Sequence, residues 1–222
     1  MKVRKPTEIH ACTDSVRARR AWGILVPKTA TPAPNSARIS VQSGYKPLIG
    51  YHGKNTFFTE LDTMGETEVS IAPGNYVFEI SAGGGFTSTP QTLEIVVNSG
   101  ETHALKASIP VTSMPQEHGW YSADLHHHSD VLDGFTQASF VLRSELAAGI
   151  DIAFLSDHDS VVNNNEMQIL SNLRGMFFIA GTELSPSWAH FNAYPLDDGK
   201  TMDIDTGQAS VQEIFAAARR MG

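Results

Sequence analysis

The chain has 222 residues, of which 41% are hydrophobic and 18% charged, the balance of a globular protein with one large or two modest domains. A formal net charge of −8 at pH 7 argues against a protein that binds nucleic acids or membrane surfaces through a basic face. The single cysteine, Cys12, excludes an internal disulfide and a zinc site built from several thiolates.

The sequence contains no run of the ~18–20 apolar residues that a membrane-spanning helix needs, so no membrane partner is expected. The basic start MKVRK is not followed by an apolar segment, and no signal peptide is expected. The alternative is a signal peptide that has already been removed from the sequence. Localisation is therefore left open between the bacterial cytoplasm and export.

Apolar and polar residues alternate with period 2 in several short segments between residues 20 and 112. In NYVFEI, for example, Tyr76, Phe78 and Ile80 share one face, as they do in a half-buried strand. Glycine and proline turn signals separate these segments. We expect a small, accessory antiparallel β-sandwich over residues 20–112, preceded by an N-terminal arm over residues 1–19.

The pattern changes after residues 113–119, which are interpreted as a linker. Over residues 120–222, strand-like segments (YSADLHHH, DIAFLSD, MFFIAGTEL and AHFNAYPL) alternate with helix-like segments (TQASFVLRSELAAG, NNEMQILSNLRG and SVQEIFAAARRMG). Thr136 is the expected N-cap of the first helix, and Ser210 with Glu213 is expected to form a capping box at the third. The alternation predicts a mostly parallel α/β sheet, whose active site would lie at the carboxyl ends of its strands.

Histidines and carboxylates occur where these strands end. Strand alternation lets His126 and His128 hold one ion while His127 faces the other side. Glu183 ends an otherwise apolar strand, where a buried carboxylate is costly unless it is paired or bound to a metal. The expected metal ligands are His126, His128, Asp133, His158, Glu183 and His190.

Several of these assignments have a plainer alternative. For Asp133 it is an Asp-Gly turn, and for His190 it is a hydrogen-bonded histidine in a half-buried strand. Asp124 and Asp157 are expected to orient ligands through hydrogen bonds rather than to bind an ion. For Asp124, plain solvation is an equal alternative.

Ligands of the His, Asp and Glu types favour divalent zinc, manganese or iron. A carboxylate that bridges two ions lets six residues serve a dinuclear site, which suits the hydrolysis of phosphoesters and related esters by a metal-activated water. The expected function is a metal-dependent hydrolase that acts on a small molecule. A binding protein with an incomplete metal site is the alternative from another class.

The motifs DLHHHSDVLDG, GIDIAFLSDHDS and GTELSPSWAHFNAY resemble, in order and spacing, the first three motifs of the PHP (polymerase and histidinol phosphatase) superfamily of metal-dependent hydrolases. The resemblance covers residues 118–196 firmly and the sandwich loosely. Together with GWYSADLH, the sandwich is similar to the branch that includes carbaryl hydrolase and phosphoesterases. The breadth of the superfamily favours a phosphoester substrate, with a carbamate or carboxylic ester as the alternative.

The resemblance also implies a ligand set and a fold. It implies one ion on His126, His128 and Glu183, a second ion bridged by Glu183 and bound by His190, and a further ion on Asp133 and His158. The family fold is a distorted β/α barrel whose later strands supply more ligands. Since this sequence reaches Gly222 before those motifs, we expect an incomplete, truncated barrel. Further residues or another chain would complete it, and the 222-residue chain would bind metal weakly and turn over little.

Overall fold

The computed structural model describes residues 7–12, 36–44, 48–49, 52–53, 55–63, 65–85 and 87–222. The chain divides into two compact units, Met1–Tyr121 with Leu146–Gly149, and Ser122–Glu145 with Ile150–Gly222. The boundary at Tyr121 falls just beyond the segment expected as a linker, where a short 3-10 helix, η1 (Pro115–His118), is found. No helix in the described part of the chain has both the length and the apolar character to cross a bilayer.

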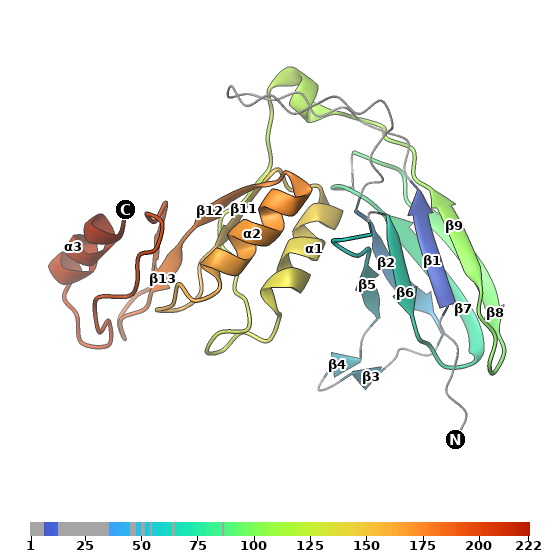
Figure 1. Cartoon of the computed structure of the whole chain (residues 1–222), viewed down its shortest axis with the longest axis horizontal. Coiled ribbons are helices and arrows are strands. Elements are labelled where there is room, and N and C mark those ends of the chain that lie inside the picture. The colour runs from blue at the N-terminus through green and yellow to red at the C-terminus, as the bar shows by residue number, and fades with distance from the viewer. Residues whose placement is uncertain are drawn as a thin grey trace. The chain divides into compact units, whose positions relative to one another are not determined.

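The first unit is built from β-strands (Figure 1). A four-stranded antiparallel sheet has the order β5-β2-β7-β8, and a three-stranded sheet has the order β6-β1-β9. The strands are β1 (Thr7–Cys12), β2 (Arg38–Ser43), β3 (Leu48–Ile49), β4 (His52–Gly53), β5 (Thr56–Phe58), β6 (Glu66–Val69), β7 (Gly74–Ser81), β8 (Gln91–Val97) and β9 (Ala104–Ser108).

The expected alternation produces the core of this unit. On β7, Tyr76, Phe78 and Ile80 are all buried, as the period-2 pattern predicts. They share one hydrophobic cluster with Val69 of β6 and Ala107 of β9, so strands of both sheets contribute to it. Burial of each large apolar side chain contributes roughly 1.5–3 kcal/mol. The assignment of this unit to the β-sandwich class nevertheless stays a prediction.

Strand β1 lies inside the segment expected as an N-terminal arm. It pairs antiparallel with β6 and parallel with β9. Both partners are more than fifty residues away in the chain, and pairing over such a separation leaves no local sequence signal. The remaining residues of the expected arm lie outside the described part of the chain.

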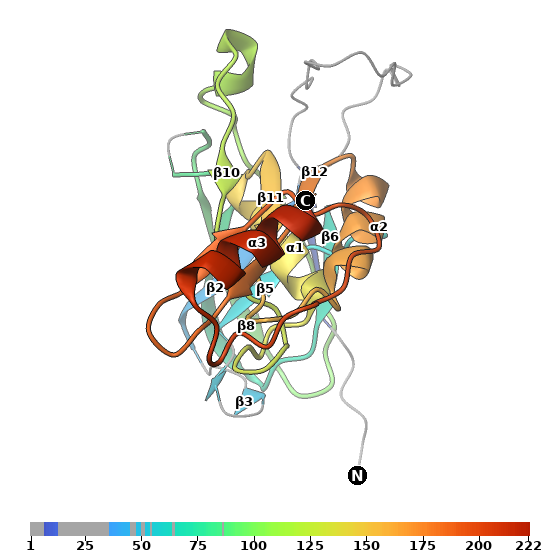
Figure 2. The ribbon, with the colours of Figure 1, turned by 90° about the vertical axis from the view of Figure 1, so that its left-hand side faces the viewer.

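The second unit begins with a parallel sheet of order β10-β11-β12 (Figures 1 and 2). Helix α2 packs against β12, and α3 shares a small core with the antiparallel pair β13-β14. The elements are β10 (Ala123–Asp124), α1 (Ala138–Ala148), β11 (Ile152–Leu155), α2 (Asn164–Arg174), β12 (Phe177–Ala180), β13 (Thr182–Leu184), β14 (Phe191–Ala193) and α3 (Val211–Met221). The last turn of α1, from Leu146, is grouped with the first unit.

The helix ends largely follow their sequence signals. The capping box of Ser210 and Glu213 at α3 is confirmed. Helix α2 is followed by Gly175 with a φ of 64°, a conformation that glycine adopts without strain. The expected N-cap Thr136 is wrong by one residue, because the backbone oxygen of Gln137 accepts the first helical hydrogen bond, from Val141.

The segment MFFIAGTEL forms two strands rather than the one expected, and the break falls at Gly181. A Cβ atom at this position would lie 2.7 Å from the carbonyl oxygen of Leu155 and 3.2 Å from that of Ala193. The glycine lets the chain pass between two other backbones and leave the parallel sheet for an antiparallel pair with β14. The expected parallel pairing therefore holds for β10, β11 and β12 but not for β14.

We expect Gly181→Ala to destabilise the protein by about 1–3 kcal/mol, because neither carbonyl group can move without breaking strand pairing. Thermal unfolding followed by circular dichroism measures the effect. Gly85→Ala is the matched control, since a Cβ there meets no atom within 4 Å. Equal melting temperatures for Gly181→Ala and the wild type would refute this packing argument.

Candidate metal centre

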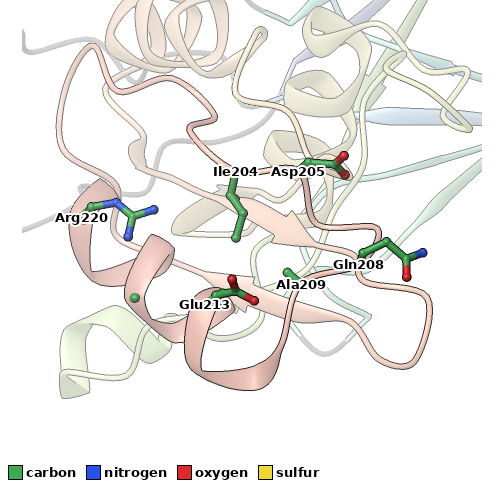
Figure 3. Close-up of a pocket in the computed structure, with 7 residues that line it drawn as sticks. Ile204, Asp205, Gln208, Ala209, Glu213 and Arg220 are labelled. Carbon is green, nitrogen blue, oxygen red and sulfur yellow. The ribbon is translucent and has the colours of Figure 1, made fainter.

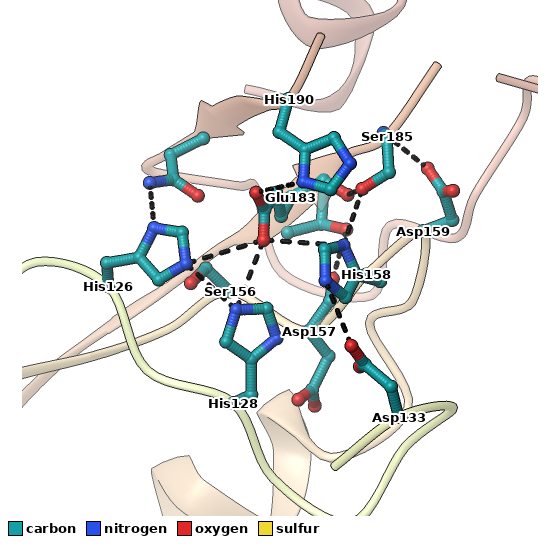
Figure 4. A network of polar contacts seen from close by, with 12 residues as sticks. His126, His128, Asp133, Ser156, Asp157, His158, Asp159, Glu183, Ser185 and His190 are labelled. Carbon is teal, nitrogen blue, oxygen red and sulfur yellow. Dashed lines mark hydrogen bonds and ion pairs between the residues drawn. The ribbon is translucent and has the colours of Figure 1, made fainter. Parts of the chain in front are cut away.

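Backbone pairing beyond β11 places His158 next to Glu183. The Glu183 N–H donates to the oxygen of Asp157 at 3.0 Å, and the Asp159 N–H donates to the oxygen of Glu183 at 2.9 Å. His158 and Glu183 thus face each other in a parallel bridge. Residues opposite each other in a bridge point to the same side. His158 Nδ1 accordingly lies 3.3 Å from Glu183 Oε2 (Figure 4).

Three further imidazoles converge on the same carboxylate. His126 Nε2 and His128 Nε2, from the loop after β10, are 2.8 Å apart and lie 3.4 and 3.1 Å from Glu183 Oε2. His190 Nδ1, from the segment before β14, lies 2.8 Å from Glu183 Oε1. Burial, together with the neighbouring His158, lowers the pKa of His128, which favours the neutral ring that binds metals.

Glu183 itself is 4% exposed, and its Oε2 atom accepts no hydrogen bond in the described part of the chain. Leaving a buried carboxylate oxygen without a partner is costly, yet three ring nitrogens face it within 3.5 Å. Imidazole rings that converge on one buried carboxylate are typical of the side chains around a divalent cation. The residues therefore fit a divalent metal.

Three overlapping groups of this cluster have ligand atoms within 4.8 Å of one another. They are His126–His128–Glu183, His128–Asp133–His158 and His158–Glu183–His190. The structure thus brings together all six residues that the sequence suggested as ligands, from four separate segments of the second unit. Each group supplies the three protein ligands that a catalytic ion usually has.

Asp133 lies at the edge of the cluster, and its side chain is 70% exposed. Its Oδ2 atom is 3.5 Å from His158 Nε2. Leu132, just before it, has a φ of 55°, a strained value for leucine that turns the loop back toward His158. A Cβ on Gly134 would collide with the backbone of Ser129, so the Asp-Gly turn is required as well. The turn and ligand interpretations of Asp133 are therefore compatible.

Asp157 supports the loop rather than an imidazole. It is 1% exposed and accepts hydrogen bonds from the N–H of Ser129 at 2.6 Å and from its hydroxyl at 2.5 Å. Ser129 directly follows His128. The buried carboxylate thereby fixes the backbone from which His128 projects.

His127 belongs to a different group, together with Asp124 and Glu145. Its Nδ1 atom lies 3.0 Å from Glu145 Oε1 and 3.0 Å from Asp124 Oδ2. The hydrogen bond with Glu145, with a further one to Asp124, raises the pKa of His127 to about 9. Asp124 thus contacts an imidazole as expected, but the imidazole is that of His127. From His126, Asp124 Oδ1 accepts a hydrogen bond of the backbone N–H.

The sequence analysis did not identify Glu145. It stands on α1 close to Val141 and Leu142, which are fully buried, and is itself 3% exposed. A glutamate on the apolar stripe of a helix was the signal that indicated a buried partner.

We expect Glu145→Gln to lower the free energy of unfolding at pH 7 by about 1 kcal/mol, because a charge-assisted hydrogen bond to His127 becomes a neutral one. Bound metal should not change, since Glu145 contacts His127 and not the Glu183 cluster. Urea unfolding and elemental analysis give the two readouts, with the exposed Glu94→Gln as control. Loss of metal from Glu145→Gln would contradict this separation.

Two other residues were also not foreseen, and both contact ring nitrogens of the cluster. The Asn192 amide lies 2.6 Å from His126 Nδ1, and the Ser185 hydroxyl lies 2.6 Å from His158 Nδ1. Asn192 is two residues after His190, so strand periodicity could have placed it on the same face. A partner that accepts the ring N–H orients an imidazole to bind a metal through its other nitrogen. The Ser185 hydroxyl can do this for His158, and Asn192 can do it for His126 when its amide oxygen rather than its nitrogen faces the ring.

A separate pocket of about 450 Å³ lies beside α3 (Figure 3). Its charged groups are already engaged: Glu213 caps α3, Arg220 pairs with Asp203 at 2.7 Å, and Asp205 accepts a hydrogen bond from the Gly207 N–H at 3.1 Å. None of the expected ligands lines it. The histidine cluster is therefore the stronger candidate for chemistry.

The fold and the cluster define a protein with a site suited to divalent metals. No known family model matches the chain, and no solved structure matches it. The chain is similar to a 5′-3′ exoribonuclease of Haemophilus influenzae, with 32% identity over 65 residues, which make up 29% of this chain and 24% of that protein. The match thus spans about a quarter of the length of that curated relative. Membership of the PHP superfamily stays a prediction.

Proposed function

We propose that this protein is a metal-dependent hydrolase that uses a water activated by two or three divalent ions, zinc, manganese or iron. The observation that carries the proposal is the buried Oε2 atom of Glu183, which faces three imidazole nitrogens and accepts no hydrogen bond from the described residues. A bound ion lowers the pKa of its water and stabilises negative charge that develops on the reacting ester.

In this proposal Glu183 uses both carboxylate oxygens. Its Oε2 atom, with His126 and His128, would hold one ion, and its Oε1 atom, with His190, would hold a second. A further ion would be held by Asp133 and His158. This is the assignment that the PHP resemblance implies. We also propose membership of that superfamily, with the second unit as the N-terminal part of a β/α barrel behind a sandwich.

We propose a phosphoester as the substrate class. The similar Haemophilus influenzae protein is a 5′-3′ exoribonuclease, and RNA is a phosphodiester. The net charge of −8 favours a small phosphoester over a nucleic acid.

A carbamate or carboxylic ester is the second candidate substrate. The six candidate ligands and their partners Ser185 and Asn192 are histidine, aspartate, glutamate, serine and asparagine, with no lysine or arginine among them to clamp a phosphate. An uncharged ester needs no such clamp.

Metal-free protein loaded with Zn²⁺, Mn²⁺ or Fe²⁺ tests the proposal against a panel of substrates. The panel is bis(p-nitrophenyl) phosphate, p-nitrophenyl phosphate and a naphthyl carbamate. We expect hydrolysis of a phosphoester that depends on metal and is lost in the His126→Ala/His128→Ala variant. Preferential cleavage of the carbamate would show that the substrate is a carbamate or carboxylic ester rather than a phosphoester. Tight metal binding without hydrolysis of any substrate would favour a binding protein and reject the hydrolase.

A further inference from the structure

His158 belongs to two of the three candidate ligand groups, although a neutral imidazole offers only one lone pair. Its Nε2 atom lies 3.5 Å from Asp133 Oδ2, and its Nδ1 atom lies 3.3 Å from Glu183 Oε2. The nitrogen that carries the hydrogen cannot bind an ion. The tautomer of His158 therefore decides which of the two groups it can serve.

Ser185 contacts the Nδ1 atom of His158. Its Oγ atom lies 2.6 Å from His158 Nδ1 and 2.9 Å from the backbone oxygen of Glu183. A serine hydroxyl has one hydrogen, and a carbonyl oxygen can only accept. If Ser185 donated to His158, its oxygen lone pairs would face the Glu183 carbonyl at 2.9 Å, which is repulsive. Both contacts are favourable only if Ser185 donates to Glu183 and accepts from His158 Nδ1–H.

The backbone around Ser185 is held in this position. The Ser185 N–H donates to Asp159 Oδ1 at 3.0 Å, and the other oxygen of that carboxylate accepts from the Thr206 hydroxyl at 2.8 Å. Asp159 adopts a φ of 45°, a strained value that these contacts maintain. The hydroxyl of Ser185 is thus fixed against His158 by neighbours on other segments.

We propose that Ser185 is a positioning residue that keeps His158 in the Nδ1–H tautomer. The lone pair of His158 Nε2 is then directed toward Asp133, so His158 serves the ion at Asp133 and not the ion shared by Glu183 and His190. The use of that lone pair for a metal rests on the proposed function. The tautomer itself does not, because it follows from hydrogen bonds within the chain.

Nitrogen NMR of the ¹⁵N-labelled, metal-free protein at a pH where the His158 ring is neutral tests the tautomer directly. Long-range proton–nitrogen correlations distinguish a protonated ring nitrogen from an unprotonated one, and a His158→Gln variant identifies the signals among the nine histidines. We expect Nδ1 of His158 to be protonated in the wild type and in Ser185→Thr, which keeps the hydroxyl. In Ser185→Ala we expect a shift toward the Nε2–H tautomer.

Zinc affinity, measured by competition with a chelator, tests the consequence. Ser185→Ala should lower the affinity for the ion at Asp133 about 10–100-fold, while Ser185→Thr should keep an affinity near that of the wild type. In an Asp133→Ala background, where that ion is already lost, Ser185→Ala should have little further effect. A general structural defect would instead weaken binding in both backgrounds.

The outcomes separate the inference from the proposed function. A wild-type His158 protonated at Nε2, or a tautomer unchanged in Ser185→Ala, overturns the inference even if the protein hydrolyses phosphoesters. Loss of affinity in Ser185→Ala that is equal in both backgrounds also overturns it. If the Nδ1–H tautomer is found but the wild type binds no metal, the tautomer assignment stands and the proposed function fails.

Discussion

Glu183→Gln is expected to remove the two ions that Glu183 would hold, with a loss of affinity larger than the roughly 10–100-fold typical of a residue that only orients a ligand. The reason is that Glu183 takes part in two of the three candidate groups and lies within 3.5 Å of four imidazoles. Glutamine keeps the shape of the side chain but not its charge. Elemental analysis and isothermal titration with Zn²⁺ give the measurement.

The stability of metal-free Glu183→Gln distinguishes a ligand from a structural ion-pair partner. If Glu183 binds metal, its buried Oε2 atom has no hydrogen bond when the ion is absent, so glutamine should leave the metal-free protein as stable as the wild type or more stable. A glutamate whose role is to pair with charged histidines would instead lose stability on this change. Glu94→Gln, on the exposed face of β8, controls for the loss of one negative charge.

Asp157→Ala is expected to give the largest loss of stability, about 3 kcal/mol in urea unfolding. The substitution removes two hydrogen bonds to a buried carboxylate and leaves the N–H of Ser129, which is fully buried, without its partner. Metal affinity should fall as well, because the loop that carries His128 loses its anchor.

Two further variants measure how much each hydrogen bond of Asp157 contributes. Asp157→Asn keeps an acceptor for the Ser129 N–H and should cost less than Asp157→Ala, and Ser129→Ala removes only the hydroxyl bond and should cost about 1 kcal/mol. An unfolding free energy for Asp157→Ala within 0.5 kcal/mol of the wild type, which is the usual range for a surface substitution, would show that Asp157 is not an anchor.

The cluster could be located from the sequence because its members follow strand-like segments that end near one another. The expected strand YSADLHHH is shorter in the structure, since β10 ends at Asp124 and the three histidines lie in the loop after it. The contacts of His127 with Asp124 and Glu145 nevertheless separate it from His126 and His128, as predicted. The convergence of His158 and Glu183 depends on parallel pairing just beyond β11, which the alternation of strands and helices predicted.

The partners of these residues could not be predicted in the same way. Glu145 reaches His127 from a helix, and Ser185 reaches His158 through a rotamer and one hydroxyl proton. Such contacts depend on tertiary packing, which leaves no periodic signal in the sequence. The types of the residues predicted that the site could bind a metal. Which side chains hydrogen-bond to its imidazoles depends instead on where each backbone segment lies.

The fold shows the same limit. Alternation predicted the core of β7, and the capping box predicted the start of α3. The split at Gly181 did not emerge from the sequence, because an apolar run with one glycine is compatible with a single strand. What decides the break is the close approach of the backbones at Leu155 and Ala193, a tertiary contact.

The central claim is that the histidine and carboxylate cluster around Glu183 is a metal centre. Elemental analysis after loading with Zn²⁺ or Mn²⁺ and removal of free ions tests it most directly, on the wild type and on His126→Ala/His128→Ala. We expect the wild type to keep weakly bound metal, at up to three ions per chain, and the double variant to keep clearly less, with unchanged circular dichroism. A wild type that retains no metal, or a double variant that retains as much as the wild type, would contradict the claim.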